Sequence, residues 1–139
     1  SFSSAYDMFT LVISDLYKKH LYLLESEHVN SFDKKIFERI VGGEASEKEI
    51  KGSLLLLTGM MQAHYGKPVI LLIDEYDVPL ENAYFGGFYE RMINLIRSLF
   101  ESALKTNDNL EFAVITGCQR KASLQRRTTL SRIPSPTRA

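Results

Sequence analysis

The spacing of apolar residues changes about halfway along the chain. Up to about residue 65, apolar residues recur every three or four positions, which is typical of amphipathic helices. Val69–Ile73 is instead a continuous apolar run of strand length, rich in β-branched residues, and Leu110–Thr116 is a second such run. We therefore expect helices first, then two strands separated by one further helix.

Local signals set the limits of these elements. Ser3 or Ser4 can cap the first helix, Gly42 and Gly43 end the second, and Ser46 with Glu49 forms a capping box that opens the third. The predicted helices span about residues 4–24, 33–41, 46–65 and 88–105, and the predicted strands span 68–73 and 111–116.

The order strand, helix, strand predicts an α/β fold. Such a crossover requires parallel pairing of the two strands and a right-handed connection. Because Val69–Ile73 does not alternate apolar with polar residues, we expect both of its faces to be covered by helices. The fold class indicated is a partial three-layer α/β domain.

Composition narrows the class of protein. With 139 residues, 45% apolar and 24% charged, the chain fits one globular domain. The formal net charge of +0 gives no general attraction to nucleic acid or to membranes, and the single cysteine, Cys118, excludes an internal disulfide framework. No transmembrane run or signal pattern occurs, so we expect no membrane partner and a cytoplasmic location.

The polarity switches abruptly after the first strand, at Asp74, Glu75 and Asp77. Open α/β sheets bind ligands at the carboxyl ends of their strands. In a Walker B element the first acid, here Asp74, holds Mg²⁺, and the second, here Glu75, activates the water that attacks a γ-phosphate. From this pattern alone, a buried strand followed by acidic turn residues explains the sequence equally well.

Thr116 ends the second strand, so parallel pairing would place it beside Asp74. A hydroxyl there can hydrogen-bond the attacking water or the γ-phosphate, although a threonine at a strand end can also simply satisfy the backbone. Gly66-Lys67 is not a Walker A motif, because position 61 is Met and position 68 is Pro, and because it precedes a strand. His20, His28 and His64 are not spaced as a metal-binding pair on one helix face.

Several segments together resemble the bacterial AAA-ATPase-like family. They are Ile70–Leu80, the helix Arg91–Phe100, Ala103–Asp108 and Phe112–Cys118, with weaker likeness around Phe37–Ile40 and Gly43–Ser46. The resemblance spans about residues 1–118, and the block around Asp74 is its most specific part.

This resemblance implies a P-loop NTPase that hydrolyses ATP with Mg²⁺. It assigns Asp74 to the metal, Glu75 to water activation and Thr116 to the sensor, and it gives Asp77 no defined role. It also implies a Walker A loop upstream, and often a PD-(D/E)XK nuclease-like domain downstream that could contact nucleic acid. We therefore expect a fragment that binds neither Mg²⁺ nor ATP stably and is inactive alone.

The resemblance stops at Cys118, and residues 119–139 differ in character. Every charged residue after Glu111 is basic, apolar residues are sparse, and Pro134 and Pro136 interrupt any regular element. We expect a disordered basic tail, and hypothesise that it is a frameshifted reading of a family sequence.

Two other functions stay open. A metal-dependent nuclease could use Asp74, Glu75 and Asp77, although a lysine beside the acids is missing. A non-catalytic interaction module could instead use an exposed sheet edge to meet a partner, a missing domain or a second copy.

Overall fold

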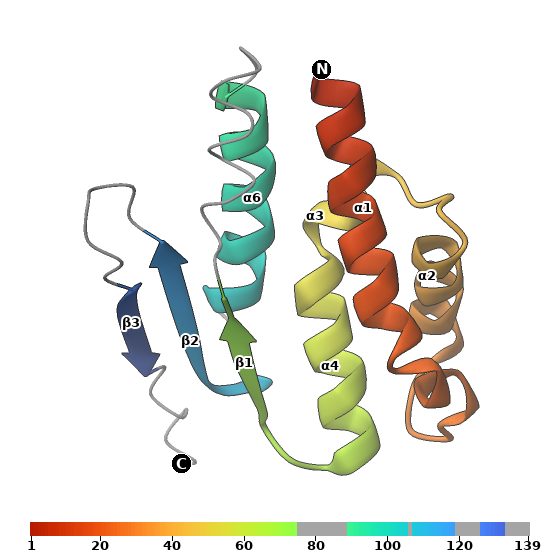
Figure 1. Ribbon diagram of the computed structural model, residues 1–139. Helices are drawn as coiled ribbons and strands as arrows, with labels where there is room; N and C mark the ends of the chain where they lie inside the picture. The colour runs from red at the N-terminus through yellow and green to blue at the C-terminus, as the bar shows by residue number, and fades with distance from the viewer. Residues whose placement is uncertain (75–88, 106, 119–125, 133–139) are drawn as a thin grey trace.

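The computed structural model describes residues 1–74, 89–105, 107–118 and 126–132, without the side chains of 89, 112, 115–118 and 126–132. A helical layer packs against a small sheet (Figure 1). Glu75, Asp77 and most of the tail lie outside the described residues. The elements are α1 Phe2–Lys18, the 3₁₀ helix η1 Leu21–Glu25, α2 Ser31–Val41, α3 Glu47–Lys51, α4 Ser53–Tyr65, β1 Val69–Ile73, α6 Tyr89–Leu104, β2 Leu110–Cys118 and β3 Arg126–Arg132.

The predicted helices are present, with two of them divided. The first ends at Lys18, and a 3₁₀ turn replaces its expected last residues. The third is broken at Gly52 into α3 and α4. The capping box of Ser46 and Glu49 is confirmed, whereas the first helix is capped by Ser1, whose hydroxyl accepts from the N–H of Ser4, and not by Ser3 or Ser4.

The sheet has the order β1-β2-β3. β1 and β2 are parallel, as predicted, with Ile73 opposite Ile115. β3 runs antiparallel to β2, so the sheet is mixed. The sequence predicted no regular element in residues 119–139, and β3 shows that backbone pairing with an adjacent strand can order a segment of low apolar content.

The core lies between the helices and one face of the sheet. Its members come from every helix that the structure describes, with Leu71 and Ile73 of β1 packed against them. The fully buried side chains include Tyr17, Leu23, Phe37, Ile40, Met60, Met92 and Leu95. Within the described part of the chain, no helix is both long and apolar enough to cross a membrane.

The expectation that both faces of β1 are covered is wrong for the described structure. Burial alternates along the strand, and Ile70 and Leu72 are 52% and 72% exposed. The physical reason is that the described helices pack on the face carrying Leu71 and Ile73. The other face of β1 therefore presents two large apolar side chains to solvent.

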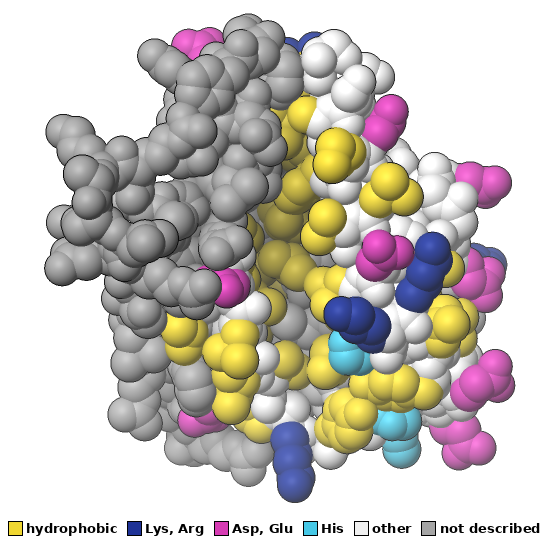
Figure 2. All heavy atoms as spheres, viewed as in Figure 1, with side chains coloured by type: hydrophobic (Ala, Val, Ile, Leu, Met, Phe, Trp, Pro, Cys, Tyr) yellow, Lys and Arg dark blue, Asp and Glu magenta, His cyan; other side chains and the backbone are white. Residues whose placement is uncertain are grey.

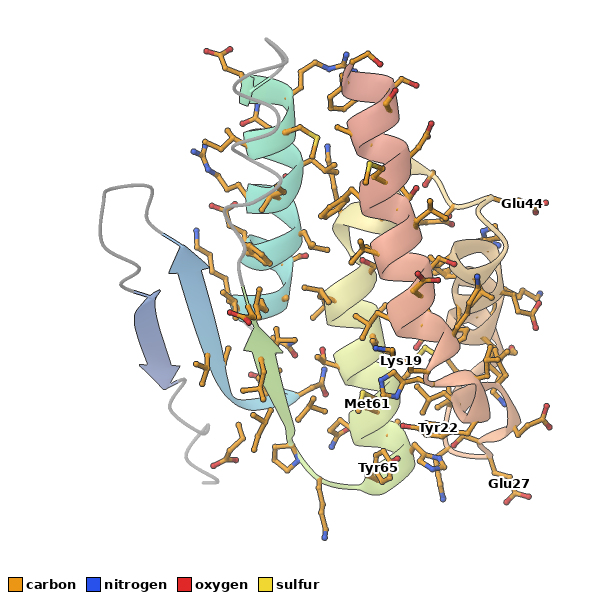
Figure 3. The ribbon with its side chains drawn as sticks, in the orientation of Figure 1. Lys19, Tyr22, Glu27, Glu44, Met61 and Tyr65 are labelled. Carbon is orange, nitrogen blue, oxygen red and sulfur yellow. The ribbon has the colours of Figure 1, made fainter. Side chains whose placement is uncertain are left out.

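Side-chain hydrogen bonds join the end of α4 to η1 and to Ser26, just before the chain enters β1. The Tyr65 hydroxyl donates to the Tyr22 hydroxyl at 2.9 Å, and His64 Nδ1 lies 2.8 Å from Ser26 Oγ. Figure 3 shows Tyr22 and Tyr65 side by side where α4 meets η1. Partial burial and the hydrogen bond with Tyr65 raise the pKa of Tyr22 to about 12, so the hydroxyl keeps its proton at neutral pH.

Candidate functional site

The parallel pairing brings two of the predicted site positions to one end of the sheet. Ile73 pairs with Ile115, so Asp74 and Thr116 each come one residue beyond that pair. Asp74 directly follows β1, whereas Thr116 lies within β2, which continues to Cys118, beyond the predicted end of that strand. Asp74 is exposed there. Thr116 is described only by its backbone, which also pairs with Thr128 of β3, and Glu75 and Asp77 lie outside the described residues.

The local sequence explains why Asp74 comes at this end. Gly66 closes α4 in the left-handed conformation with φ +66°, and its N–H donates to the Gln62 carbonyl. A residue with a side chain is strained at this φ, which is why glycine suits the turn. The chain then reverses through Pro68 into β1. The dipeptide Gly66-Lys67 thus ends a helix and precedes a strand, as the sequence indicated.

A buried asparagine aligns the two strands at their other end, and sequence reasoning missed it. Asn107 is 1% exposed, and its side-chain amide donates to Thr58 Oγ1 at 3.0 Å and to the Ala103 carbonyl at 2.8 Å. Its Oδ1 accepts from the Asn109 N–H at 3.1 Å. The Asn109 carbonyl then accepts from the Val69 N–H at 2.7 Å.

This network ties α4, α6, β1 and β2 together. Because it fixes where β2 starts against β1, it also sets which residues come level at the far ends of the strands. The sequence signal was an asparagine just after a helix and before a strand, which a turn explains equally well. Asn107 is a positioning residue in this arrangement.

The described residues at the strand ends offer one carboxylate, that of Asp74, and no closed metal cage. Within the described residues, no group of three His, Cys, Asp or Glu side chains could hold a metal ion. Mg²⁺, however, commonly binds through one or two carboxylates together with water and substrate phosphates. A single exposed carboxylate at a sheet edge can serve as such a ligand.

Comparison with known proteins decides the family. The model of the AAA-ATPase-like family, described as predicted AAA-ATPase, matches residues 3–124. The chain belongs to the AAA-ATPase-like family. The match reaches six residues beyond Cys118, where the sequence resemblance had been expected to end. No curated protein and no solved structure matches the chain.

Membership of the AAA-ATPase-like family bears on the function of the acidic residues that follow β1. It indicates an ATPase-related function and interaction with nucleotide. The match includes β1, β2 and the segment between them, and therefore all of the predicted site residues.

Proposed function

We propose that this chain carries the Walker B and sensor portion of an ATP-hydrolysing, AAA-like P-loop domain. The observation that carries the proposal is the parallel β1–β2 pair, with residues 74 and 116 one step beyond Ile73 and Ile115. Family membership over residues 3–124 supports it.

Each residue has a separate role in this proposal. Asp74 binds Mg²⁺ through its carboxylate, Glu75 accepts a proton from the attacking water, and Thr116 hydrogen-bonds that water or the γ-phosphate. The metal supplies charge neutralisation at the β- and γ-phosphates. The location that suits such a domain is the cytoplasm.

The sequence given lacks the motif whose groups hold the phosphates of ATP. Backbone N–H groups and a lysine of a G-x-x-x-x-G-K-[ST] loop normally hold the phosphates, and this sequence contains no such motif. We propose that these groups come from outside the sequence given, and that the isolated chain binds Mg²⁺·ATP weakly and hydrolyses little or none of it.

Paramagnetic broadening tests the metal role without requiring turnover. With Mn²⁺·ATP added to the isotopically labelled chain, amide signals of residues near Asp74 and Thr116 should broaden first. Asp74→Asn should remove most of that broadening, whereas Asp108→Asn, at an exposed acid in the α6–β2 turn, should not. Broadening that is spread over other acids and insensitive to Asp74→Asn would contradict the proposal.

ATP turnover by the purified chain tests the predicted inactivity. We expect no sustained release of phosphate. Sustained Mg²⁺-dependent hydrolysis that Glu75→Gln abolishes would show that the chain needs no external phosphate-binding loop, and that part of the proposal would fail.

A further inference from the structure

Three aromatic side chains form a continuous hydrogen-bond network where η1 meets α4. The Tyr65 hydroxyl donates to the Tyr22 hydroxyl at 2.9 Å, and the Tyr22 oxygen lies 3.0 Å from His20 Nδ1. The rings also contact one another, edge to face. Figure 2 shows histidine side chains at the surface of the helical layer, beside apolar and basic ones. This set of three residues, called here the His20 network, joins the residue before η1 to the last residue of α4.

The direction of donation within the His20 network determines the protonation state that it requires. A tyrosine hydroxyl has one proton to donate. Because Tyr22 accepts from Tyr65, its own proton is directed to His20, and Nδ1 is the acceptor. An imidazole nitrogen accepts only when it carries no proton, so His20 is neutral here, with its proton on Nε2. In the imidazolium both nitrogens donate, so both hydroxyls would have to turn or one bond would have to break.

The surroundings of His20 also disfavour a positive charge on its ring. Partial burial and the adjacent charge of Lys19 lower the pKa of His20 below its ordinary value of 6.5. The titratable and charged residues of the adjoining segments are Asp15, Lys18 and Lys19 at the end of α1, Glu25 of η1, Glu27 and His28 after it, Asp33, Lys34, Lys35, Glu38 and Arg39 of α2, and His64 and Tyr65 of α4. Of these charges, Lys19 is the one that acts on the pKa of His20.

We propose that the His20 network is a proton-controlled connection, which holds η1 to the end of α4 while His20 is neutral and weakens when His20 takes up a proton. Tyr65 is the last residue of α4, and Gly66 and Pro68 follow it before β1 begins. A weakened connection therefore frees the segment from which β1 starts. The network uses none of the proposed ATPase residues, so the two proposals can fail separately.

The neutral network stabilises the fold above the ordinary pKa of histidine and not far below it. Because the pKa of His20 is lowered in the fold, the unfolded chain binds more protons than the folded chain as the pH falls through 6.5. The contribution is therefore fully present above pH 6.5, and it is lost as the pH falls through the lowered pKa.

NMR titration of the imidazole signals in the whole chain tests the network. The titration midpoint of His20 should lie below 6.5, and Tyr22→Phe, which removes the bond to Nδ1, should raise it. Tyr65→Phe should raise it too, although the Tyr65 hydroxyl bonds to Tyr22 and not to His20, because the Tyr22 oxygen is then free to accept from a protonated Nδ1.

A matched control for this titration is Tyr6→Phe, at a tyrosine of α1 whose ring stacks on Phe2. It should leave the midpoint of His20 unchanged. A midpoint at or above 6.5, or one that Tyr65→Phe does not move, would overturn the proposal.

Hydrogen exchange tests the weakening itself. The Gly66 N–H donates to the Gln62 carbonyl at 2.8 Å, and its protection, corrected for the intrinsic exchange rate, should fall between about pH 7.5 and about pH 5. His20→Asn supplies an amide oxygen that accepts and takes up no proton, so it should abolish the fall. His28→Asn, at an exposed histidine, should preserve it. Protection that does not change with pH, or a fall that survives His20→Asn, would refute the proposed control by His20.

Discussion

Apolar side chains are buried to different extents in the helical layer and in β1 of the sheet. In the helices, buried apolar faces meet one another, and no buried side-chain polar atom in the described part of the chain lacks a hydrogen-bond partner. In β1, an equally apolar sequence has one face packed and one face exposed. An apolar run in the sequence therefore indicates side chains that favour burial. How many of them are buried depends on which other elements pack against them. We expect substitutions in the helical layer to lower the free energy of unfolding far more than substitutions on the bare face of β1.

The largest expected contrast is between two leucines. Leu95 of α6 is 1% exposed and Leu72 is 72% exposed. Leu95→Ala should lower the free energy of unfolding by about 2–5 kcal/mol, because it removes buried methyl groups and leaves a cavity. Leu72→Ala should lower it by about 0.5 kcal/mol or less. Urea denaturation at a concentration where the chain is monomeric measures both, and equal losses would contradict the one-sided packing of β1.

The second contrast concerns the junction between the two regions. Asn107→Ala removes the hydrogen bonds that join α4, α6 and the start of β2, and should cost about 2 kcal/mol because buried partners lose their bonds. Asn94→Ala, at an exposed position of α6, is the control and should cost nothing measurable. Hydrogen exchange should also show faster exchange at the Val69 N–H in Asn107→Ala; unchanged protection there would mean that Asn107 does not position β1.

A smaller effect is expected within the helical layer. The Tyr17 hydroxyl donates to the Ser53 carbonyl at 2.6 Å in a fully buried setting, and burial raises the pKa of that hydroxyl well above its usual range. Tyr17→Phe should cost about 1 kcal/mol through this lost bond. Tyr65→Phe, at a 55% exposed tyrosine, should change the denaturation midpoint far less, and a reversed order would refute this account of the core.

The smallest effect is a pH dependence at the surface. Hydrogen bonds from Arg39 and from the Ser46 backbone hold the pKa of Glu49 below its ordinary value of 4.5. The carboxylate therefore stabilises the fold above about pH 4.5, and this contribution is lost as the pH falls through the lowered pKa. Glu49→Gln should lower the melting temperature slightly at pH 7, and the difference from the unaltered chain should shrink as the pH falls below 4.5 and through the lowered pKa of Glu49. A difference that is constant with pH would show that the carboxylate charge does not contribute.

Much of the fold could be predicted because local signals and periodicity agreed. In α6 the apolar residues that recur at helical spacing are buried, namely Met92, Leu95, Ile96, Leu99 and Ala103, and the parallel pairing followed from the crossover. In α1 the apolar residues at helical spacing include Val12, which is 65% exposed. Helical spacing shows which residues share a side, but the width of the buried part depends on which neighbours pack there.

The sequence predicted where the candidate site lies, but not the residues and the strand that hold it in place. Asp74 follows a run whose polarity changes within one residue, a signal that needs no tertiary knowledge. Asn107 acts through contacts with Thr58 and Ala103, and the first of these is distant in sequence. The strand β3 depends on pairing with β2 and has no strong apolar pattern of its own. The roles of Glu75 and Thr116 stay predictions.

The irregularity at the start of the β1–β2 ladder has a consequence for chemistry at the opposite end. Val69 is opposite Leu110, but Ile70 is opposite Phe112, so β2 has one more residue than β1 at that step. If the ladder ran regularly from Val69 and Leu110 with Glu111 in place, Asp74 would come level with Ile115, which has no hydroxyl, and not with Thr116. Deleting Glu111 would remove the irregularity and keep Thr116 level with Asp74, whereas straightening the ladder around Glu111 would exchange an alcohol for a hydrocarbon next to the acid. The register between β1 and β2 therefore matters as much for any reaction at this end of the sheet as the acid itself does.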